Sequence, residues 1–184
     1  NTLRLLEYCR QASLPVTWKI IIVVNGSSDN TELIAKQLAN QHPTEISTRV
    51  YSEPGRGQAL LSAWSASQAD IFAYMDCDLA VGLEALPLLI SPLANNSASI
   101  TIGSRFLSES RVSRSWRREI ISRLYNQFVR LLLGNSVRDL QCGFKALHSS
   151  AFTILKPLLR DSYWLLDTEL LVWAERLDLP ITEI

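Results

Sequence analysis

The sequence predicts an α/β fold with a mainly parallel sheet and helices on both of its faces. Short apolar runs that suit buried strands alternate with amphipathic stretches of about ten residues that suit helices. Polar loops follow several of the strand-like runs, as at the ligand-binding edge of such sheets. The chain has 184 residues, 47% of them apolar and 20% charged, which is enough for one sizeable core and short for two domains.

The first five expected elements alternate between helix and strand. Residues 3–11 have apolar side chains at helical spacing, and the run KIIIVV at 19–24 is rich in β-branched residues. An amphipathic helix is expected at 31–41, a strand at 47–52 and a helix at 57–68. Because helices join the strands, we expect parallel pairing.

The alternation continues in the second half. The apolar run at 71–75 predicts a strand, and a helix interrupted by prolines follows it. A further strand is expected at 98–104 and a long helix at 116–134. A doubly wound domain normally begins with a strand, whereas this chain opens on a helix. We therefore expect residues 1–184 to be one domain that lacks its first strand and is trimmed at both ends.

The charge distribution bears on the partners. The formal net charge is zero, so no global field favours nucleic acid. From Arg105 to Arg138, however, eight arginines stand against Glu109 and Glu119, which gives +6 there and −6 elsewhere. Arginine matches phosphate oxygens, although such a segment can also be a solvated helix face. No apolar run approaches the about 20 residues of a membrane span, and three cysteines without metal-ligand spacing favour a reduced, cytoplasmic chain.

Two aspartates, Asp76 and Asp78, follow the apolar run at 71–75. Because side chains alternate along a strand, both carboxylates are expected to point one way and Cys77 the other. Neighbouring carboxylates suit Mg²⁺ or Mn²⁺, which usually completes its shell with waters and substrate phosphates. Aspartates also end strands without binding a metal, so the pair alone leaves both interpretations open.

Other polar loops are expected at the same edge of the sheet. The loop NGSSDNT begins at Asn25 and contains Asp29, and the loop EPGRGQA contains Arg56 and Gly57. Each could be only a tight turn. Since the carboxyl ends of parallel strands lie at one edge, three such loops are expected to gather there.

The last part of the chain adds further candidates. Arg105 lies in a loop after a strand, and Arg118 and Ser122 lie one turn apart on the next helix. The apolar stripe of that helix is expected to consist of Ile121, Leu124, Phe128 and Leu131 or Leu132.

Two carboxyl-terminal stretches also carry polar candidates. RDLQCGFKALH has little helical pattern and contains Asp139 and Gly143. WLLDTELLVWAERL, residues 164–177, predicts a helix with Asp167 and Glu169 among large apolar residues. Asp167 is interpreted as an N-cap, whereas a carboxylate such as Glu169 on a mostly buried helix needs a partner.

Taken in order, these stretches resemble the polyprenyl-phosphate glycosyltransferases of family two, the group that includes dolichol-phosphate mannose synthase. The resemblance runs from about Lys19 to Ile184 and rests on NGSSDNT, GRGQAL, YMDCDLA, IGSRF, REIISRLYN, DLQCGFKAL and DTELL. It implies a GT-A fold, which is a Rossmann-like α/β domain. It also implies transfer of a hexose, with inversion, from GDP-mannose or a UDP-hexose to a polyprenyl phosphate at the cytoplasmic face of a membrane.

The resemblance implies roles for single residues. Asp76 and Asp78 are expected to bind Mg²⁺ or Mn²⁺ on the donor diphosphate. Arg105, with Arg118 and Ser122, is expected to contact the acceptor phosphate, and catalysis is assigned to Asp78 and the two arginines. The remaining substrate-binding candidates are Asn25, Asp29, Arg56, Gly57, Asp139, Gly143 and Glu169.

Three alternatives remain at the level of sequence. A family member could act on a non-lipid acceptor. A non-catalytic nucleotide-sugar-binding domain would explain two departures, Asn25 where the family loop commonly has aspartate and Ala80 where some members have glutamine. A phosphatase of the haloacid dehalogenase type also uses Asp-x-Asp, but its motif usually lies at the first strand and continues to a threonine.

Overall fold

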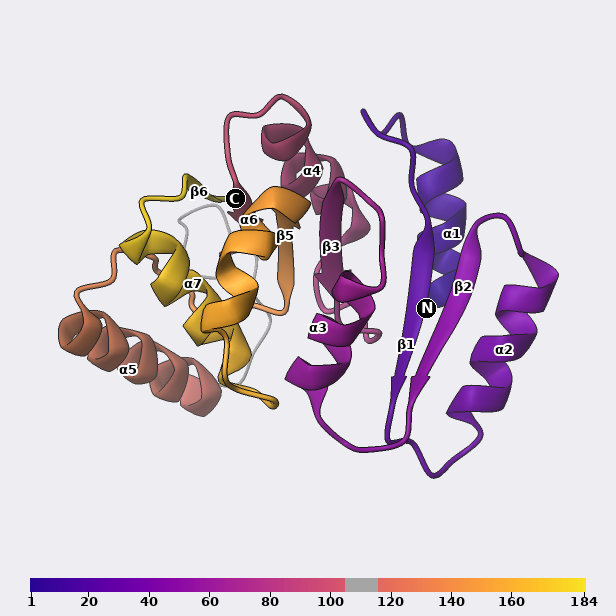
Figure 1. Cartoon of the computed structure of the whole chain (residues 1–184), viewed down its shortest axis with the longest axis horizontal. Coiled ribbons are helices and arrows are strands. Elements are labelled where there is room, and N and C mark those ends of the chain that lie inside the picture. The colour runs from indigo at the N-terminus through magenta and orange to yellow at the C-terminus, as the bar shows by residue number, and fades with distance from the viewer. Residues whose placement is uncertain (105–115) are drawn as a thin grey trace.

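The structure is a computed structural model that describes residues 1–104 and 116–184; the side chains of residues 116–120, 122 and 123 lie outside that description. Helices surround two sheets (Figure 1). The element order is α1 (Thr2–Gln11), β1 (Ile20–Asn25), α2 (Thr31–Gln41), β2 (Ile46–Tyr51), α3 (Arg56–Ser65), β3 (Ile71–Met75), the 3₁₀ turn η1 (Leu83–Ala85), α4 (Leu86–Ala94), β4 (Ile100–Ile102), α5 (Trp116–Leu133), β5 (Phe144–His148), α6 (Ser149–Leu155), the 3₁₀ turn η2 (Lys156–Leu158), α7 (Leu166–Arg176) and β6 (Ile181–Glu183).

The elements expected from the sequence are present, with small shifts at their ends. Among the α-helices and strands of the described residues, three were not expected, namely β5, α6 and β6. β5 lies in the stretch that has little helical pattern. Its lysine, Lys145, is only 1% exposed and interrupts what would otherwise be an apolar strand. A charged residue at a buried position breaks the apolar run from which a strand would be predicted.

The strand pairing is partly parallel. β1 and β2 pair in parallel, as do β4 and β6. In the four-stranded sheet, of order β3-β5-β4-β6, β5 runs antiparallel to both of its neighbours. β5 begins opposite Met75, the last residue of β3, because the chain returns from α5 at the carboxyl ends of the strands. The sheet is therefore mixed, and β5 starts at the edge where the polar loops gather.

Helices cover both faces of the four-stranded sheet, as expected. One buried cluster contains Trp64 of α3, Phe72 of β3 and apolar residues of β4, α5, α6 and α7. The rings of Trp64 and Phe72 stack with their centroids 5.9 Å apart. The second cluster joins α1 and α4 to Phe144 and Ala146 of β5. Two faces of packed apolar side chains thus fix the strand ends from which the site is built.

The helix α5 does not pack through the stripe expected from its sequence. It lies beside α7 (Figure 1), and the hydroxyl oxygens of Tyr125 and Thr168 are 3.1 Å apart. Val129 is buried in the core cluster. The residues of the expected stripe are instead between 62% and 79% exposed, namely Ile121, Leu124, Phe128, Leu131 and Leu132. Within the described residues, no helix is long and apolar enough to cross a membrane.

Candidate active site

The two aspartates lie in a turn directly after β3. The strand ends at Met75, and the N–H of Leu79 donates to the carbonyl oxygen of Asp76 at 3.1 Å. Asp78 Oδ1 accepts from the N–H of Ala80 at 3.0 Å. The alternation argument for the two carboxylates was therefore wrong, because both residues follow the end of the strand and the turn sets their directions.

The carboxylate of Asp76 lies between Arg56 and Gly143. Arg56 Nη2 is 3.5 Å from Asp76 Oδ1. A Cβ atom built on Gly143 would be 2.3 Å from Asp76 Oδ2, which is closer than atoms can approach. Because Gly143 has no side chain, the carboxylate of Asp76 can occupy this space. The Asp76 side chain remains 54% exposed, so it can still take a ligand.

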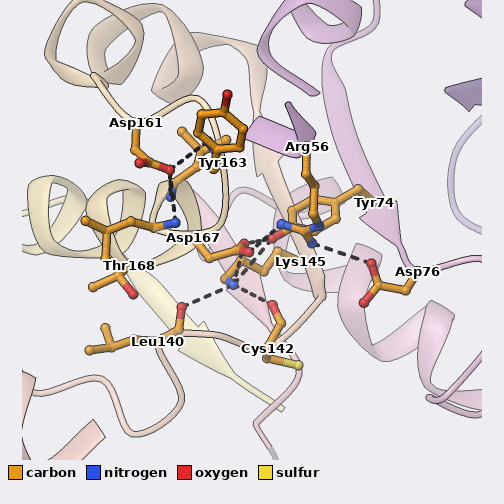
Figure 2. Close-up of polar contacts among 12 residues, drawn as sticks. Arg56, Tyr74, Asp76, Leu140, Cys142, Lys145, Asp161, Tyr163, Asp167 and Thr168 are labelled. Atoms are coloured by element: carbon orange, nitrogen blue, oxygen red, sulfur yellow. Dashed lines mark hydrogen bonds and ion pairs between the residues drawn. The ribbon is translucent and has the colours of Figure 1, made fainter. Parts of the chain in front are cut away.

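Arg56 is the first residue of α3 and points toward β3 and α7 (Figure 2). Its Nη1 donates to Asp167 Oδ2 at 2.7 Å. The guanidinium carbon lies 5.3 Å from the ring centroid of Tyr74 and 5.1 Å from that of Trp164. An arginine between two aromatic faces is restricted in orientation. The second polar loop therefore presents a fixed cation to the turn that carries Asp76.

Asp167 is not the N-cap that its sequence position indicated. The N-cap of α7 is Leu165, and Asp167 lies inside the first turn with its carboxylate directed into the protein. Its oxygens accept hydrogen bonds from Arg56, Lys145 and the hydroxyl of Tyr74. Burial raises the pKa of Asp167 to about 6, against the opposing charge and hydrogen bond of Arg56.

Lys145 extends this cluster to the segment before β5. Its Nζ donates to Asp167 Oδ1 at 2.8 Å, to the carbonyl oxygen of Leu140 at 3.4 Å and to that of Cys142. The sequence reasoning missed both Lys145 and Tyr74. The available signal was a lysine inside an apolar run, since a buried ammonium needs several acceptors.

The first two polar loops lie together, as expected. Asn25 Oδ1 accepts from the N–H of Gly55 at 2.9 Å, which joins the loop after β1 to the loop after β2. Gly26 has a φ of 59°, and a Cβ atom built on it would be 2.8 Å from the nitrogen of Pro54. The side-chain oxygen of Asn25 thus shapes the site. An aspartate at this position could accept the same bond.

Asp29 lies within the first polar loop. Its Oδ1 accepts from the N–H of Thr31 at 2.9 Å. Hydrogen bonds from the side chain of Thr31 and from its backbone N–H lower the pKa of Asp29 below its ordinary value. A negative charge is favourable at the start of α2. In this structure Asp29 therefore stabilises the start of that helix, through its hydrogen bond with the N–H of Thr31.

Gly57 lets a loop from the carboxyl-terminal part of the chain lie on α3. A Cβ atom built on it would be 2.9 Å from both the carbonyl carbon of Ser162 and the oxygen of Tyr163. Next to it, the N–H of Gln58 donates to the oxygen of Ser162 at 3.0 Å. Gly57 therefore allows the backbone of α3 to lie close to that of Ser162 and Tyr163. This role differs from the direct substrate contact expected from the sequence.

Glu169 has hydrogen-bond partners, as expected, although its side chain is only partly buried. Its Oε2 accepts from the N–H groups of Arg160 at 2.8 Å and Asp161 at 2.9 Å. Asp161 in turn accepts, through Oδ1, from Leu165 at 2.9 Å and Leu166 at 3.1 Å, and so caps α7. Glu169 and Asp161 together hold the loop that covers Arg56.

The expected acceptor residues are not placed by the structure. Arg105 lies outside the described residues, and Arg118 and Ser122 lie on α5 with side chains outside the description. Asp139, which was proposed as a substrate-binding residue without an acceptor role, is fully buried, and its N–H donates to Glu183 Oε1 at 3.3 Å. These assignments stay predictions.

The donor atoms at the aspartate turn limit what kind of metal could bind. Among the described residues, no group of three or more His, Cys, Asp and Glu side chains could hold a metal ion. The turn offers two carboxylates, and that of Asp76 is half-exposed. This set fits a hard divalent ion that takes its other ligands from substrate oxygens and water, and it does not fit a cage made of protein alone.

The fold is similar to that of a known sugar-transferring enzyme. Glucosyl-3-phosphoglycerate synthase from Mycobacterium tuberculosis, solved in complex with Mn²⁺, UDP and glucosyl-3-phosphoglycerate, has a TM-score of 0.64 and 23% identity. The match covers 90% of this chain and 57% of that one. The expected GT-A-type fold is thereby confirmed.

Several curated proteins are similar over the whole chain. Glycosyltransferase AglD from Haloferax volcanii is 34% identical over 184 residues, and this chain covers 30% of its length. Dolichyl-phosphate beta-glucosyltransferases from Trichomonas vaginalis (ALG5D) and Homo sapiens are each 28% identical, and the chain covers 58% and 60% of them. The chain thus spans about 30–60% of the length of these relatives. The model of glycosyl transferase family 2 matches residues 2–155. This chain belongs to glycosyl transferase family 2.

Proposed function

We propose that the chain transfers a hexose, with inversion, from a nucleotide-diphosphate sugar to the phosphate of a polyprenyl lipid at the cytoplasmic face of a membrane. The observation that carries the proposal is the exposed carboxylate of Asp76, which lies between Arg56 and Gly143 at the edge where the polar loops meet. Relatives named as dolichyl-phosphate beta-glucosyltransferases support the lipid phosphate acceptor and favour glucose as the sugar.

The donor diphosphate is assigned to the turn after β3. Asp76 and Asp78 would hold Mg²⁺ or Mn²⁺, and such an ion stabilises the charge of the departing nucleotide. The Mn²⁺ and UDP bound to the synthase of similar fold are compatible with this assignment. Arg56, with its side chain 18% exposed, contributes a fixed positive charge beside Asp76. Its charge faces the place where negative charge accumulates as the sugar leaves.

The acceptor requires neutralisation rather than deprotonation. A lipid phosphate is anionic at neutral pH, so its oxygen needs no strong general base to attack the sugar. The difficulty is bringing two anions together, which cations relieve. We assign this task to Arg105 and Arg118, with Ser122 as a hydrogen-bond donor to the phosphate. Direct attack by the phosphate oxygen inverts the anomeric carbon.

The stripe of α5 supports an acceptor that lies in a membrane. Its apolar residues are exposed on a helix that belongs to the +6 segment. An exposed apolar face combined with arginines favours the surface of an anionic leaflet, where basic residues contribute about 1 kcal/mol each. We therefore assign the stripe, which lies on the same helix as Arg118 and Ser122, to a lipid surface.

Calorimetric titration with UDP, GDP, UDP-glucose and GDP-mannose tests the donor assignment, each with and without Mn²⁺. We expect one nucleotide to bind only with Mn²⁺. Asp76→Asn should abolish this Mn²⁺-dependent binding. Equal nucleotide affinity with and without Mn²⁺, or no nucleotide binding by a folded sample, would contradict the proposal and favour a non-catalytic domain.

Transfer to a polyprenyl phosphate tests the acceptor assignment. Arg118→Ala is expected to abolish transfer to the lipid phosphate while the affinity for the nucleotide stays nearly unchanged. A lost nucleotide affinity would place Arg118 at the donor instead. Transfer to a soluble saccharide in preference to the lipid would show a non-lipid acceptor.

A further inference from the structure

One buried carboxylate on α7, that of Asp167, contacts both Arg56, which lies beside Asp76, and Lys145 (Figure 2). On the first side, Asp167 Oδ2 accepts from Arg56 Nη1 at 2.7 Å, and Arg56 Nη2 lies 3.5 Å from Asp76 Oδ1. The guanidinium therefore bridges a buried carboxylate and an exposed one. Because arginine donors form a rigid planar fork, fixing one of its nitrogens also restricts the other.

The second side runs through Lys145. Asp167 Oδ1 accepts from Lys145 Nζ at 2.8 Å. The same ammonium donates to the carbonyl oxygens of Leu140 and Cys142. The next residue, Gly143, lies against Asp76 Oδ2. The two oxygens of Asp167 thus serve the two segments that enclose the Asp76 carboxylate.

We infer that Asp167 is a positioning residue for the donor-binding end of the site. It fixes Arg56 on one side of Asp76 and, through Lys145, the segment that ends at Gly143 on the other. The inference rests on the proposed function, because it assigns this end of the site to the donor diphosphate. Because Asp167 is only 5% exposed, we assign it no contact with the metal or the substrate and a role through its partners.

Energetics favour this interpretation over a purely structural one. Buried ion pairs contribute little net stability, because the loss of hydration offsets the attraction between the charges. Three charged side chains of low exposure, Arg56, Lys145 and Asp167, are therefore a poor way to stabilise a core. They are a good way to hold a carboxylate and a guanidinium in a defined geometry before a ligand binds.

Asp167→Asn tests the inference, because it keeps the size of the side chain and removes its charge. We expect the affinity for UDP in the presence of Mn²⁺ to fall about tenfold in calorimetric titration. In an Arg56→Gln background the same substitution should change the affinity clearly less than in the unsubstituted chain, since one of the two partners of Asp167 is already lost and only the route through Lys145 remains. Glu45→Gln, which removes the exposed partner of Arg10, is the matched control and should leave the affinity unchanged.

Circular dichroism and thermal unfolding establish that each variant is folded. If Asp167→Asn does not fold, Tyr74→Phe removes only the hydroxyl that donates to Asp167, and a loss of about threefold is expected. Unchanged affinity in a folded Asp167→Asn protein, or equal effects with and without Arg56, would overturn the positioning role alone. Absence of metal-dependent nucleotide binding by the unsubstituted chain would overturn the proposed function and this inference together.

Discussion

Gly143 lies directly against Asp76, so closely that a Cβ atom on the glycine would be 2.3 Å from Asp76 Oδ2. The two residues are far apart in the sequence, and they meet because β5 begins beside the last residue of β3. The absence of a side chain at Gly143 therefore sets the position of a carboxylate in the turn after another strand. A glycine can be required for a ligand site without touching the ligand.

Gly143→Ala is expected to weaken metal-dependent nucleotide binding about tenfold with little loss of stability. The added methyl group meets the end of an exposed side chain, so the Asp76 carboxylate moves rather than the backbone. Calorimetric titration of UDP with Mn²⁺ measures the effect. In an Asp76→Asn background the same substitution should cost no further affinity, and an equal cost there would show that Gly143 acts on something other than Asp76.

Gly57→Ala is expected to act on stability instead. Its Cβ atom would meet the backbone of Ser162 and Tyr163, which cannot move aside as a side chain can. Overpacking of this kind costs about 1–3 kcal/mol of unfolding free energy, which urea denaturation measures. Gln58→Ala, at the next and exposed position of α3, should stay within about 0.5 kcal/mol of the unsubstituted chain. Equal stabilities of the two variants would contradict the close packing.

Periodicity was sufficient to predict most of the fold. Helices such as 31–41 and strands such as 71–75 were found with their expected bounds, because the apolar residues recur at helical spacing or the whole run is apolar. The antiparallel strand β5 was not predicted. Its Lys145 is stabilised by carbonyl oxygens of the segment just before it and by the carboxylate of Asp167 on α7, and no local pattern contains the latter.

The candidate site was predictable only in part, for the same reason. Asp76, Arg56 and Gly143 were proposed from motifs, and the structure brings them together. Asp167 was interpreted as an N-cap because that interpretation uses only its neighbours in sequence. Its partners come from α3, β3 and β5, so its contribution could be seen only in three dimensions.

The pKa of Asp167 predicts how stability changes with pH. Arg56, Lys145 and Tyr74 face its carboxyl group, yet burial dominates and raises the pKa to about 6 from 3.8. Between these values the folded chain binds more protons than the unfolded chain. The contribution of Asp167 to the unfolding free energy is therefore fully present below about pH 4 and is lost as the pH rises through about 6, by at most about 3 kcal/mol.

Urea denaturation at several pH values from 4 to 7 checks this prediction. The unsubstituted chain should lose stability relative to Asp167→Asn as the pH rises across that interval. The asparagine variant supplies the reference because it cannot titrate at this position. A constant difference between the two proteins, or one that changes in the opposite direction, would show that the cations around Asp167 outweigh its burial.

The exposed stripe of α5 predicts binding to lipid vesicles. Leu124 and Phe128 are 62% and 65% exposed, and burying such side chains in a membrane interface contributes roughly 1.5–3 kcal/mol each. Serine at both positions should lower partitioning onto anionic vesicles at least about tenfold in a flotation assay. The matched control replaces Leu33 and Ile34, which are 57% and 54% exposed on α2, and should leave partitioning unchanged. An equal loss in the control would mean that the binding is not specific to α5. Self-association that the α5 serines abolish, without vesicle binding, would assign the stripe to a second copy of the chain instead.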